Sequence, residues 1–244
     1  KQQIYKWVNK KVARKSAHII TISDFVKNDL VGFTGISPDK ITVTLESADK
    51  LPKGNDPVKS LIGKKFIMYI GRPTPHKNLR RLIDAFALLQ KKYPELTLAL
   101  AGKKDSNYNR HETYVNDHNI KNVIFTDFIS DEQLRWMYEN TAVYCFPSLS
   151  EGFGLPGLEA MLHGAPVASS TATCLPETHG DAAHYFDPYD VEDIARAIDD
   201  LLTDEKLRRR LIKKGKQHVK TFSWKRMAEQ TLAVYEQYGN QNKN

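Results

Sequence analysis

Short apolar runs alternate with amphipathic helical patterns through most of the chain. The runs cover residues 66–70, 96–101, 122–126, 142–146, 166–170 and, more weakly, 182–186. They are rich in β-branched or large apolar residues and scarcely alternate with polar ones, which is typical of strands covered on both faces. Strand–helix alternation at this spacing predicts an α/β fold with a doubly wound parallel, Rossmann-like sheet.

The segments between these runs carry helical signals. In residues 79–93 one face is apolar, and Asn78 stands where an N-cap is expected. Ser130 and Gln133 have the spacing of a capping box ahead of another apolar face. Further helices are predicted for residues 190–202, 204–220 and 223–238.

The first fifty residues repeat this pattern on a smaller scale. A basic helix precedes a strand at residues 18–23, a helix at 24–33 and a strand at 40–45. The polar stretch 46–60, with two prolines and a glycine, is interpreted as a linker. We therefore expect residues 1–50 to be the tail of an incomplete α/β domain, residues 51–222 a complete one, and residues 223–244 a separate C-terminal helix.

Composition narrows the class of protein. The chain has 244 residues, of which 41% are hydrophobic and 27% charged, as in an ordinary soluble globular protein. No apolar run approaches the roughly 20 residues of a membrane span. The chain begins with Lys1, so its start is not expected to be natural and says nothing of targeting. Cys145 and Cys174 form no disulfide or metal framework, which fits a reducing cytoplasm.

The formal net charge is +7, and the basic residues cluster in segments 6–15 and 207–220. A solvated helix face explains such clusters. The alternative is attraction to anionic substrates or to anionic lipid headgroups, and hence peripheral membrane contact. No nucleic-acid-binding module or aromatic platform accompanies the charge, so no nucleic acid partner is expected.

Candidate chemistry begins where the run 66–70 ends. Gly71 opens the segment GRPTPHKN, which leads directly into a helix. A strand, a glycine turn and a helix N-terminus together present backbone N–H groups and a positive dipole end. Arg72 and Lys77 add two cations, so this mouth suits a diphosphate. The alternative is a surface loop with incidental charges, and the segment is not a Walker loop.

A second cluster, EGFGLPGLE, follows the run 142–146. Gly152 and Gly154 permit close approach of the backbone to a ligand, while Pro156 suits a first helical turn and Gly164 a C-terminal cap. The backbone N–H groups of residues 153–155 can meet phosphate oxygens.

Two carboxylates frame this segment. Glu151 lies in the predicted loop and Glu159 about one turn inside the predicted helix, both near the carboxyl edge of the sheet. Carboxylates accept hydrogen bonds from paired hydroxyl groups, which ribose and hexose both present. Glu177 and His179 follow in LPETH, interpreted as a helix start or, alternatively, as lining of the same cleft.

The string EGFGLPGLEAM, preceded by GR…KN, resembles the group 1 (family four) retaining glycosyltransferases, which have two Rossmann-like domains in the GT-B arrangement. The strings LPETHGDAAHYFDPYDVEDIARAI and FSW agree with it. The resemblance covers about residues 17–238 and is most specific from 122 to 194.

The resemblance implies roles for individual residues. Arg72 and Lys77 would hold the donor diphosphate and stabilise the leaving nucleotide. Glu151 would contact hydroxyls of the transferred sugar, and Glu159 those of the ribose. The remaining residues implied in donor binding are Gly71, Lys103, Phe128 and Ile129 (the last two at the base), and Gly152, Phe153, Gly154 and Leu155 through their backbone.

The activity implied is transfer of a hexose from a nucleotide-diphosphate sugar with retention of configuration. GDP-mannose is the first candidate donor and a UDP-sugar the second, with a glycan or lipid-linked acceptor and no further cofactor. No Asp-x-Asp motif is present, so no metal is expected, and the cations and loop amides would neutralise the leaving group. Glu151 as a covalent nucleophile is an alternative.

Two departures leave other functions open. The linker reads VTLESADKL where many relatives have an asparagine-glycine turn. Most of the N-terminal domain, which holds the acceptor pocket in this family, has no counterpart in the chain. A nucleotide-sugar-binding module without turnover, or an epimerase or phosphorylase on the same fold, therefore remain alternatives.

Overall fold

The computed structural model describes residues 2–54 and 56–239, which fall into two compact units. Unit 1 combines Lys1–Ser47 with Thr221–Asn244, and unit 2 is Ala48–Lys220. Each unit is described by itself.

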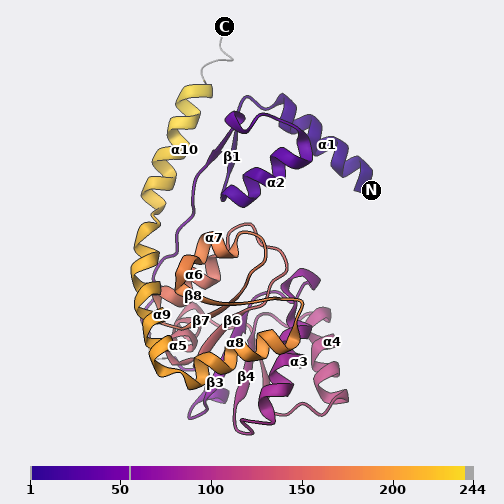
Figure 1. Ribbon diagram of the computed structural model, residues 1–244, viewed down its shortest axis with the longest axis vertical. Coiled ribbons are helices and arrows are strands. Elements are labelled where there is room, and N and C mark those ends of the chain that lie inside the picture. The colour runs from indigo at the N-terminus through magenta and orange to yellow at the C-terminus, as the bar shows by residue number, and fades with distance from the viewer. Residues whose placement is uncertain (1, 55, 240–244) are drawn as a thin grey trace. The chain divides into compact units, whose positions relative to one another are not determined.

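Unit 2 is built around a six-stranded sheet with helices on both faces (Figure 1). Its strands are β3 (Phe66–Ile70), β4 (Thr97–Ala101), β5 (Val123–Asp127), β6 (Val143–Phe146), β7 (Val167–Ser170) and β8 (Ala183–Phe186). Its helices are α3 (Leu79–Gln90), α4 (Ser106–Asp117), α5 (Asp131–Asn140), α6 (Leu155–Leu162), α7 (Leu175–His179), α8 (Val191–Thr203) and α9 (Glu205–His218).

The strand order is β5-β4-β3-β6-β7-β8, and every neighbouring pair is parallel. The chain winds outward from β3 to β5 and then returns to the centre to continue through β6 to β8. The predicted doubly wound parallel sheet is therefore confirmed. The winding direction reverses between β3 and β6, which is where ligands bind in such sheets.

Alternation along the strands builds two apolar layers. Ile67 of β3, Leu98 of β4 and Cys145 of β6 pack with α3 and α8 in the main core. On the other face, Phe66 stacks on Trp136 of α5, and Tyr138 of α5 meets the ring of Tyr144 edge-on. Because successive strand residues point to opposite faces, runs without polar interruption are needed to cover both.

Most helix starts follow the local signals. Ser130 and Gln133 form the predicted capping box of α5, and Asp190 and Asp204 cap α8 and α9. Asn78 is the N-cap residue of α3, as expected, but it does not cap the helix through its side chain. Asn78 precedes α3 with φ 58°, and its side chain makes no capping hydrogen bond.

Unit 1 contains a small parallel sheet of β1 (Ile19–Thr21) and β2 (Ile41–Val43). Its helices are α1 (Gln2–Lys15), α2 (Asp24–Thr34) and α10 (Trp224–Gly239). Its core is small, with Ala13, Ile36 and Ile41 at the centre. Within this unit, His18 stacks on Tyr238 of α10 with ring centroids 4.2 Å apart.

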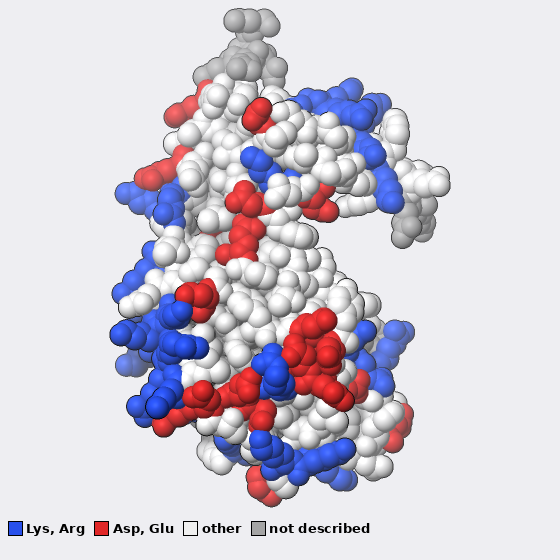
Figure 2. Space-filling view, in the orientation of Figure 1, with Lys and Arg blue, Asp and Glu red and all other residues white. Residues whose placement is uncertain are grey.

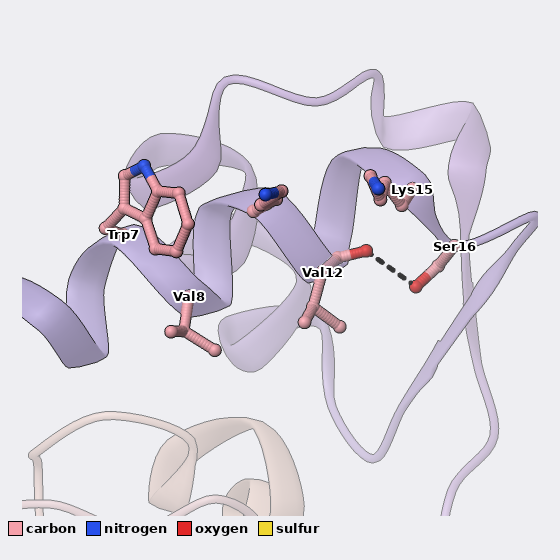
Figure 3. A pocket seen from close by; sticks show the side chains of 6 residues that line it. Trp7, Val8, Val12, Lys15 and Ser16 are labelled. Atoms are coloured by element: carbon pink, nitrogen blue, oxygen red, sulfur yellow. Dashed lines mark hydrogen bonds between the residues drawn. The ribbon is translucent and has the colours of Figure 1, made fainter.

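Helix α1 exposes apolar side chains between its cations. Trp7 is 60% exposed and Val12 57%, and with Val8 they border a hollow of about 360 Å³ (Figure 3). Among the described residues, no helix combines the length and apolar character required to cross a membrane.

Candidate functional site

The site residues gather at the carboxyl ends of the central strands of unit 2. The loop after β3 carries Arg72 and Lys77, and the loop after β6 carries Glu151. Because β3 and β6 are neighbours that run parallel, both loops leave the sheet at the same edge. They flank the point where the winding reverses, so the topology places cations and a carboxylate at the expected ligand position.

Lys77 and Glu151 form an ion pair between these loops. The Lys77 Nζ donates to Glu151 Oε1 at 2.6 Å, and the side chains are 23% and 13% exposed. Charge-assisted hydrogen bonds of this kind are short and strong. An ammonium group has three N–H donors, so Lys77 can keep this bond and still donate to a ligand oxygen.

Asn78 and His76, on either side of Lys77, hold the two loops together. The Asn78 amide donates to the carbonyl of Pro147 at 3.0 Å and to that of Pro188 at 2.7 Å. The Leu149 N–H donates to the His76 carbonyl at 2.7 Å. Three consecutive residues thus fasten the β3 loop to the β6 loop, and Asn78 owes its position to these tertiary bonds.

The backbone of Glu151 is held from the loop after β7. Its N–H donates to Thr173 Oγ1 at 3.0 Å, and its carbonyl accepts from the Cys174 thiol at 3.2 Å. Burial raises the pKa of Cys174 to about 12, so the thiol stays protonated and can donate. Glu151 is therefore fixed through its main chain as well as its carboxylate.

His179 positions the glycine turn that follows. It is fully buried, with Nε2 3.2 Å from the Gly154 carbonyl and Nδ1 3.1 Å from Ser169 Oγ. The pKa of His179 is lowered to about 4, mainly by burial; the bond to the Gly154 carbonyl opposes this shift, and the charge of His218 adds to it. The ring is therefore neutral at pH 7, with its proton assigned to Nε2 because a carbonyl can only accept.

Two glycines make this arrangement possible. Gly154 has φ 103°, in the region that favours glycine. A Cβ on Gly157 would lie 2.1 Å from His179 Nε2, so only glycine admits the imidazole against the start of α6. Phe153, between Glu151 and this turn, is 3% exposed and anchors the loop in the core. Leu155 begins α6, with Pro156 in its first turn as predicted.

Glu159 lies on α6 beside Tyr138 of α5. The Tyr138 hydroxyl is 3.2 Å from Glu159 Oε2 and 3.3 Å from the Pro156 carbonyl. Burial raises the pKa of Glu159, and the hydrogen bond from Tyr138 opposes that shift. Glu159 is thus a partly buried hydrogen-bond acceptor, and the hydroxyl of Tyr138 stabilises its ionised form.

Two further phenols lie beneath the site. The hydroxyls of Tyr69 and Tyr144 are buried and have no hydrogen-bond partner among the described residues. Burial raises the pKa of both well above the usual range, with smaller contributions that include the charge of Glu151. Both phenols therefore stay neutral, and each is held away from water.

The Arg72 side chain pairs with Asp105, which follows β4, and not with Glu151, the partner of Lys77. Its Nε is 3.2 Å from Asp105 Oδ2, and with Lys103 these residues line a cavity of about 420 Å³. The Arg72 side chain is 76% exposed, so this surface pair holds it weakly. The hydroxyl of Tyr108, buried beneath, lies 2.8 Å from the carbonyl oxygens of both Gly71 and Ala101, which share its one proton.

Phe128 and Ile129 follow β5. A bulge at the end of β5 places Asp127 at φ 61°, where its carboxylate accepts from the Lys104 N–H at 2.8 Å. The Phe128 ring is 77% exposed, so it is available to a ligand at this edge.

The structure thus joins some of the predicted residues in direct contact and only aligns others along one edge. Lys77 meets Glu151, and Arg72 shares a cavity with Lys103, whereas Glu159 bonds to Tyr138, which belongs to neither pair. The sequence gives no sign of the supporting roles of Tyr108 and Thr173. It singles out Asn78 as a helix cap and His179 as a helix start or cleft lining, but not the hydrogen bonds that these two residues make across the site. Within residues 2–54 and 56–239, no group of three His, Cys, Asp or Glu side chains is arranged to hold a metal ion.

A doubly wound parallel sheet with charged side chains at its switch point defines a Rossmann-like ligand-binding domain. The family profile described as "Glycosyl transferases group 1" matches residues 53–218, so the chain belongs to that family. It resembles mainly the C-terminal domain of its GT-B members.

Individual relatives agree. O-antigen chain mannosyltransferase B of Escherichia coli is 32% identical over 230 residues, 89% of this chain and 60% of that protein. Sucrose-phosphate synthase of Thermosynechococcus elongatus superposes with a TM-score of 0.82 at 25% identity, covering 96% of this chain and 61% of that one. HepE of Anabaena, solved with UDP and glucose, gives 0.77 at 19% identity, covering 92% and 64%. The chain thus spans about 60% of the length of this mannosyltransferase.

Proposed function

We propose that unit 2 binds a nucleoside-diphosphate sugar at the carboxyl edge of its sheet, for transfer of the hexose with retention of configuration. The observation that carries the proposal is the Lys77–Glu151 pair, which joins a phosphate-type cation to a hydroxyl acceptor at the switch point. The complex of HepE with UDP and glucose supports a donor of this class.

Different site residues contact different parts of the donor. Arg72 and Lys103, which line one cavity, and Lys77 face the diphosphate. Glu151 accepts hydroxyls of the hexose and Glu159 those of the ribose. Gly71, Gly152 and the N–H groups of residues 153–155 approach the phosphates, and Phe128 and Ile129 receive the base.

The reaction breaks the bond between the anomeric carbon and the diphosphate oxygen and forms one to an acceptor hydroxyl. Its central demand is to neutralise the charge that develops on the leaving diphosphate, and preorganised cations meet that demand. We propose that the acceptor attacks from the face the phosphate leaves and that its proton passes to the departing phosphate oxygen. The configuration is then retained, and Glu151 orients the sugar through hydrogen bonds without forming a covalent bond to it.

The hexose is proposed to be mannose. The E. coli relative is a mannosyltransferase, and it acts in O-antigen chain synthesis, which supports a glycan or lipid-linked acceptor. The donor would then be GDP-mannose, with a UDP-sugar as the alternative that the HepE complex favours.

A thermal-shift screen tests the donor site. A ligand that binds only the folded state raises the unfolding midpoint by mass action. We expect a shift with GDP and GDP-mannose that exceeds the shifts with UDP, ADP and their sugars. Glu159→Ala and Arg72→Ala each reduce it, whereas Lys64→Ala, an exposed lysine before β3, does not. If none of the nucleotides raises the unfolding midpoint, the proposal is contradicted.

A binding module without turnover is the second candidate. The observation in its favour is that every residue assigned above to the donor lies in unit 2. A turnover assay on this chain, compared with a longer chain that includes a complete partner domain, separates the two. Activity in the longer chain alone assigns binding to unit 2 and catalysis to the whole protein.

A further inference from the structure

A basic groove of about 640 Å³ lies on unit 2, apart from the site described above. Its lining residues are Lys50, Leu162, Arg209, Ile212, Lys213, Lys216, Gln217 and Lys220. Every charged residue in that lining is a cation. Figure 2 shows Lys and Arg gathered over α9, along the left edge of the view.

The cations form a stripe along α9. Arg209, Lys213 and Lys216 are spaced by four and three residues, so they share one face of the helix, and Lys220 follows just past its end. Over these residues the stripe extends about 16 Å at the helical rise. The four side chains are exposed, while Ile212 between them is partly buried and forms an apolar floor.

Few carboxylates balance this charge. Glu205 is the single acidic residue of α9, and its pair with Arg209 leaves both side chains largely exposed, at 61% and 76%. Within the described ranges, Lys213, Lys216 and Lys220 have no carboxylate at ion-pair distance. Clustered cations without counter-charges create a positive potential that attracts an extended anionic partner.

We propose that this groove docks the protein on an anionic lipid surface. The arrangement favours a surface over a single phosphate, because the cations lie along the helix and all the polar side chains that line the groove are exposed rather than buried around one point. Apolar side chains between the cations can contact the headgroup region. The proposal goes beyond glycosyl transfer and holds whether or not the chain turns over a sugar.

Vesicle sedimentation tests this surface on the full chain. We expect binding to phosphatidylcholine vesicles that contain phosphatidylglycerol, none to phosphatidylcholine alone, and weaker binding at higher salt. Removing three cations with Lys213→Gln/Lys216→Gln/Lys220→Gln is expected to weaken binding about a hundredfold, since each contributes about fivefold. Lys59→Gln/Lys64→Gln/Lys65→Gln removes the same charge from exposed positions before β3 and is the matched control.

Several outcomes overturn the proposal. If the groove variant binds vesicles as well as the unchanged protein does, the contact lies elsewhere, for instance on α1. If both variants lose the same affinity, the binding reflects the net charge of the protein and not the groove. Displacement by inorganic phosphate, but not by sodium chloride of equal ionic strength, indicates a single-anion site. Binding of a short single-stranded RNA that depends on these lysines, without binding to vesicles, assigns the groove to nucleic acid. Circular dichroism verifies that both variants are folded.

Discussion

Lys77 donates to Glu151 at 2.6 Å across the loops that follow two adjacent strands, and the two residues are 74 positions apart in the chain. Sequence position alone placed each beside the same sheet edge. The contact joins them into one unit, because a mostly buried charge depends on its partner. A substitution at either residue is therefore expected to affect both the stability and the proposed binding of the donor.

The first prediction concerns this pair. Lys77→Met and Glu151→Gln each remove one partner and are expected to lower the free energy of unfolding by about 3–5 kcal/mol, because the other charge is left buried without compensation. The double variant is expected to lose less than the sum of the two. Urea unfolding followed by circular dichroism gives the coupling energy.

Lys92→Met is the matched control for that measurement. Lys92 pairs with Asp199 at 2.7 Å but is 57% exposed, so its removal is expected to change the unfolding midpoint little. Additive losses in the Lys77 and Glu151 variants would show that the two charges are stabilised separately.

The second prediction is a pH dependence at His179. Its pKa falls from 6.5 in the unfolded chain to about 4 in the folded one, because burial disfavours the charged ring. The unfolded state therefore binds the proton first as the pH falls. The contribution of the neutral His179 ring to the free energy of unfolding is fully present above pH 6.5. It is lost between about pH 6.5 and 4, by an amount on the order of 3 kcal/mol.

Comparison with His179→Gln isolates this contribution, because glutamine does not titrate and the histidines that do not interact with His179 contribute equally to both proteins. The difference in the free energy of unfolding between the two proteins is expected to shrink as the pH is lowered from 7.5 to 5. Parallel profiles would show that the ring is already charged or that its pKa is ordinary.

The third prediction uses the contact between Gly157 and His179. A Cβ at Gly157 would lie 2.1 Å from Nε2, so Gly157→Ala is expected to destabilise unit 2 by about 1–3 kcal/mol through overpacking. In a His179→Ala background that space is open, and the same substitution is expected to cost far less. An equal loss in both backgrounds would mean that the α6 backbone, rather than the imidazole, excludes the methyl group.

Sequence patterns were sufficient for the elements and their order but not for the supports of the site. Uninterrupted apolar runs and the capping box at Ser130 are local signals, and the strands and helices follow them. Asn78 looked like a helix cap, yet its amide bonds the carbonyls of Pro147 and Pro188, which are 69 and 110 positions away. The fold brings such distant partners together, and no local sequence pattern predicts them.

Glycines show the same limit. The sequence places Gly154 in a loop, where it permits close approach of the backbone to a ligand, and in the structure it has the positive φ that glycine favours. Gly157 carries no turn signal, because it lies inside α6 and is required by an imidazole from a helix that begins after the next strand. The reason for that glycine appears only when α6 and α7 are seen together.

The fourth prediction rests on the proposed ribose contact of Glu159. Burial raises the pKa of this carboxyl, and the ionised form is the one that accepts hydroxyl groups at both oxygens. Nucleotide affinity is therefore expected to fall as the pH is lowered through the raised pKa. Because the hydrogen bond from Tyr138 lowers that pKa, Tyr138→Phe is expected to move the fall to higher pH.

Isothermal titration with GDP over a pH series measures this effect, and Glu159→Gln is the control that should flatten it. A profile that is unchanged in Glu159→Gln would assign the titration to another group and remove Glu159 from the ribose contact.

The last prediction contrasts buried phenols that differ in their partners. The Tyr144 hydroxyl is buried without a hydrogen-bond partner among the described residues, whereas that of Tyr108 donates to the Gly71 and Ala101 carbonyls. Removing an unsatisfied buried hydroxyl relieves its desolvation cost, so Tyr144→Phe is expected to raise the free energy of unfolding by about 1 kcal/mol. Tyr108→Phe is expected to lower it by about 1–3 kcal/mol, because two buried carbonyls lose a donor at the ends of β3 and β4. Urea unfolding measures the free energy of unfolding of both variants, and each substitution removes the same hydroxyl group, so the two values can be compared directly. A loss of stability in Tyr144→Phe similar to that in Tyr108→Phe would show that the Tyr144 hydroxyl is hydrogen-bonded in solution.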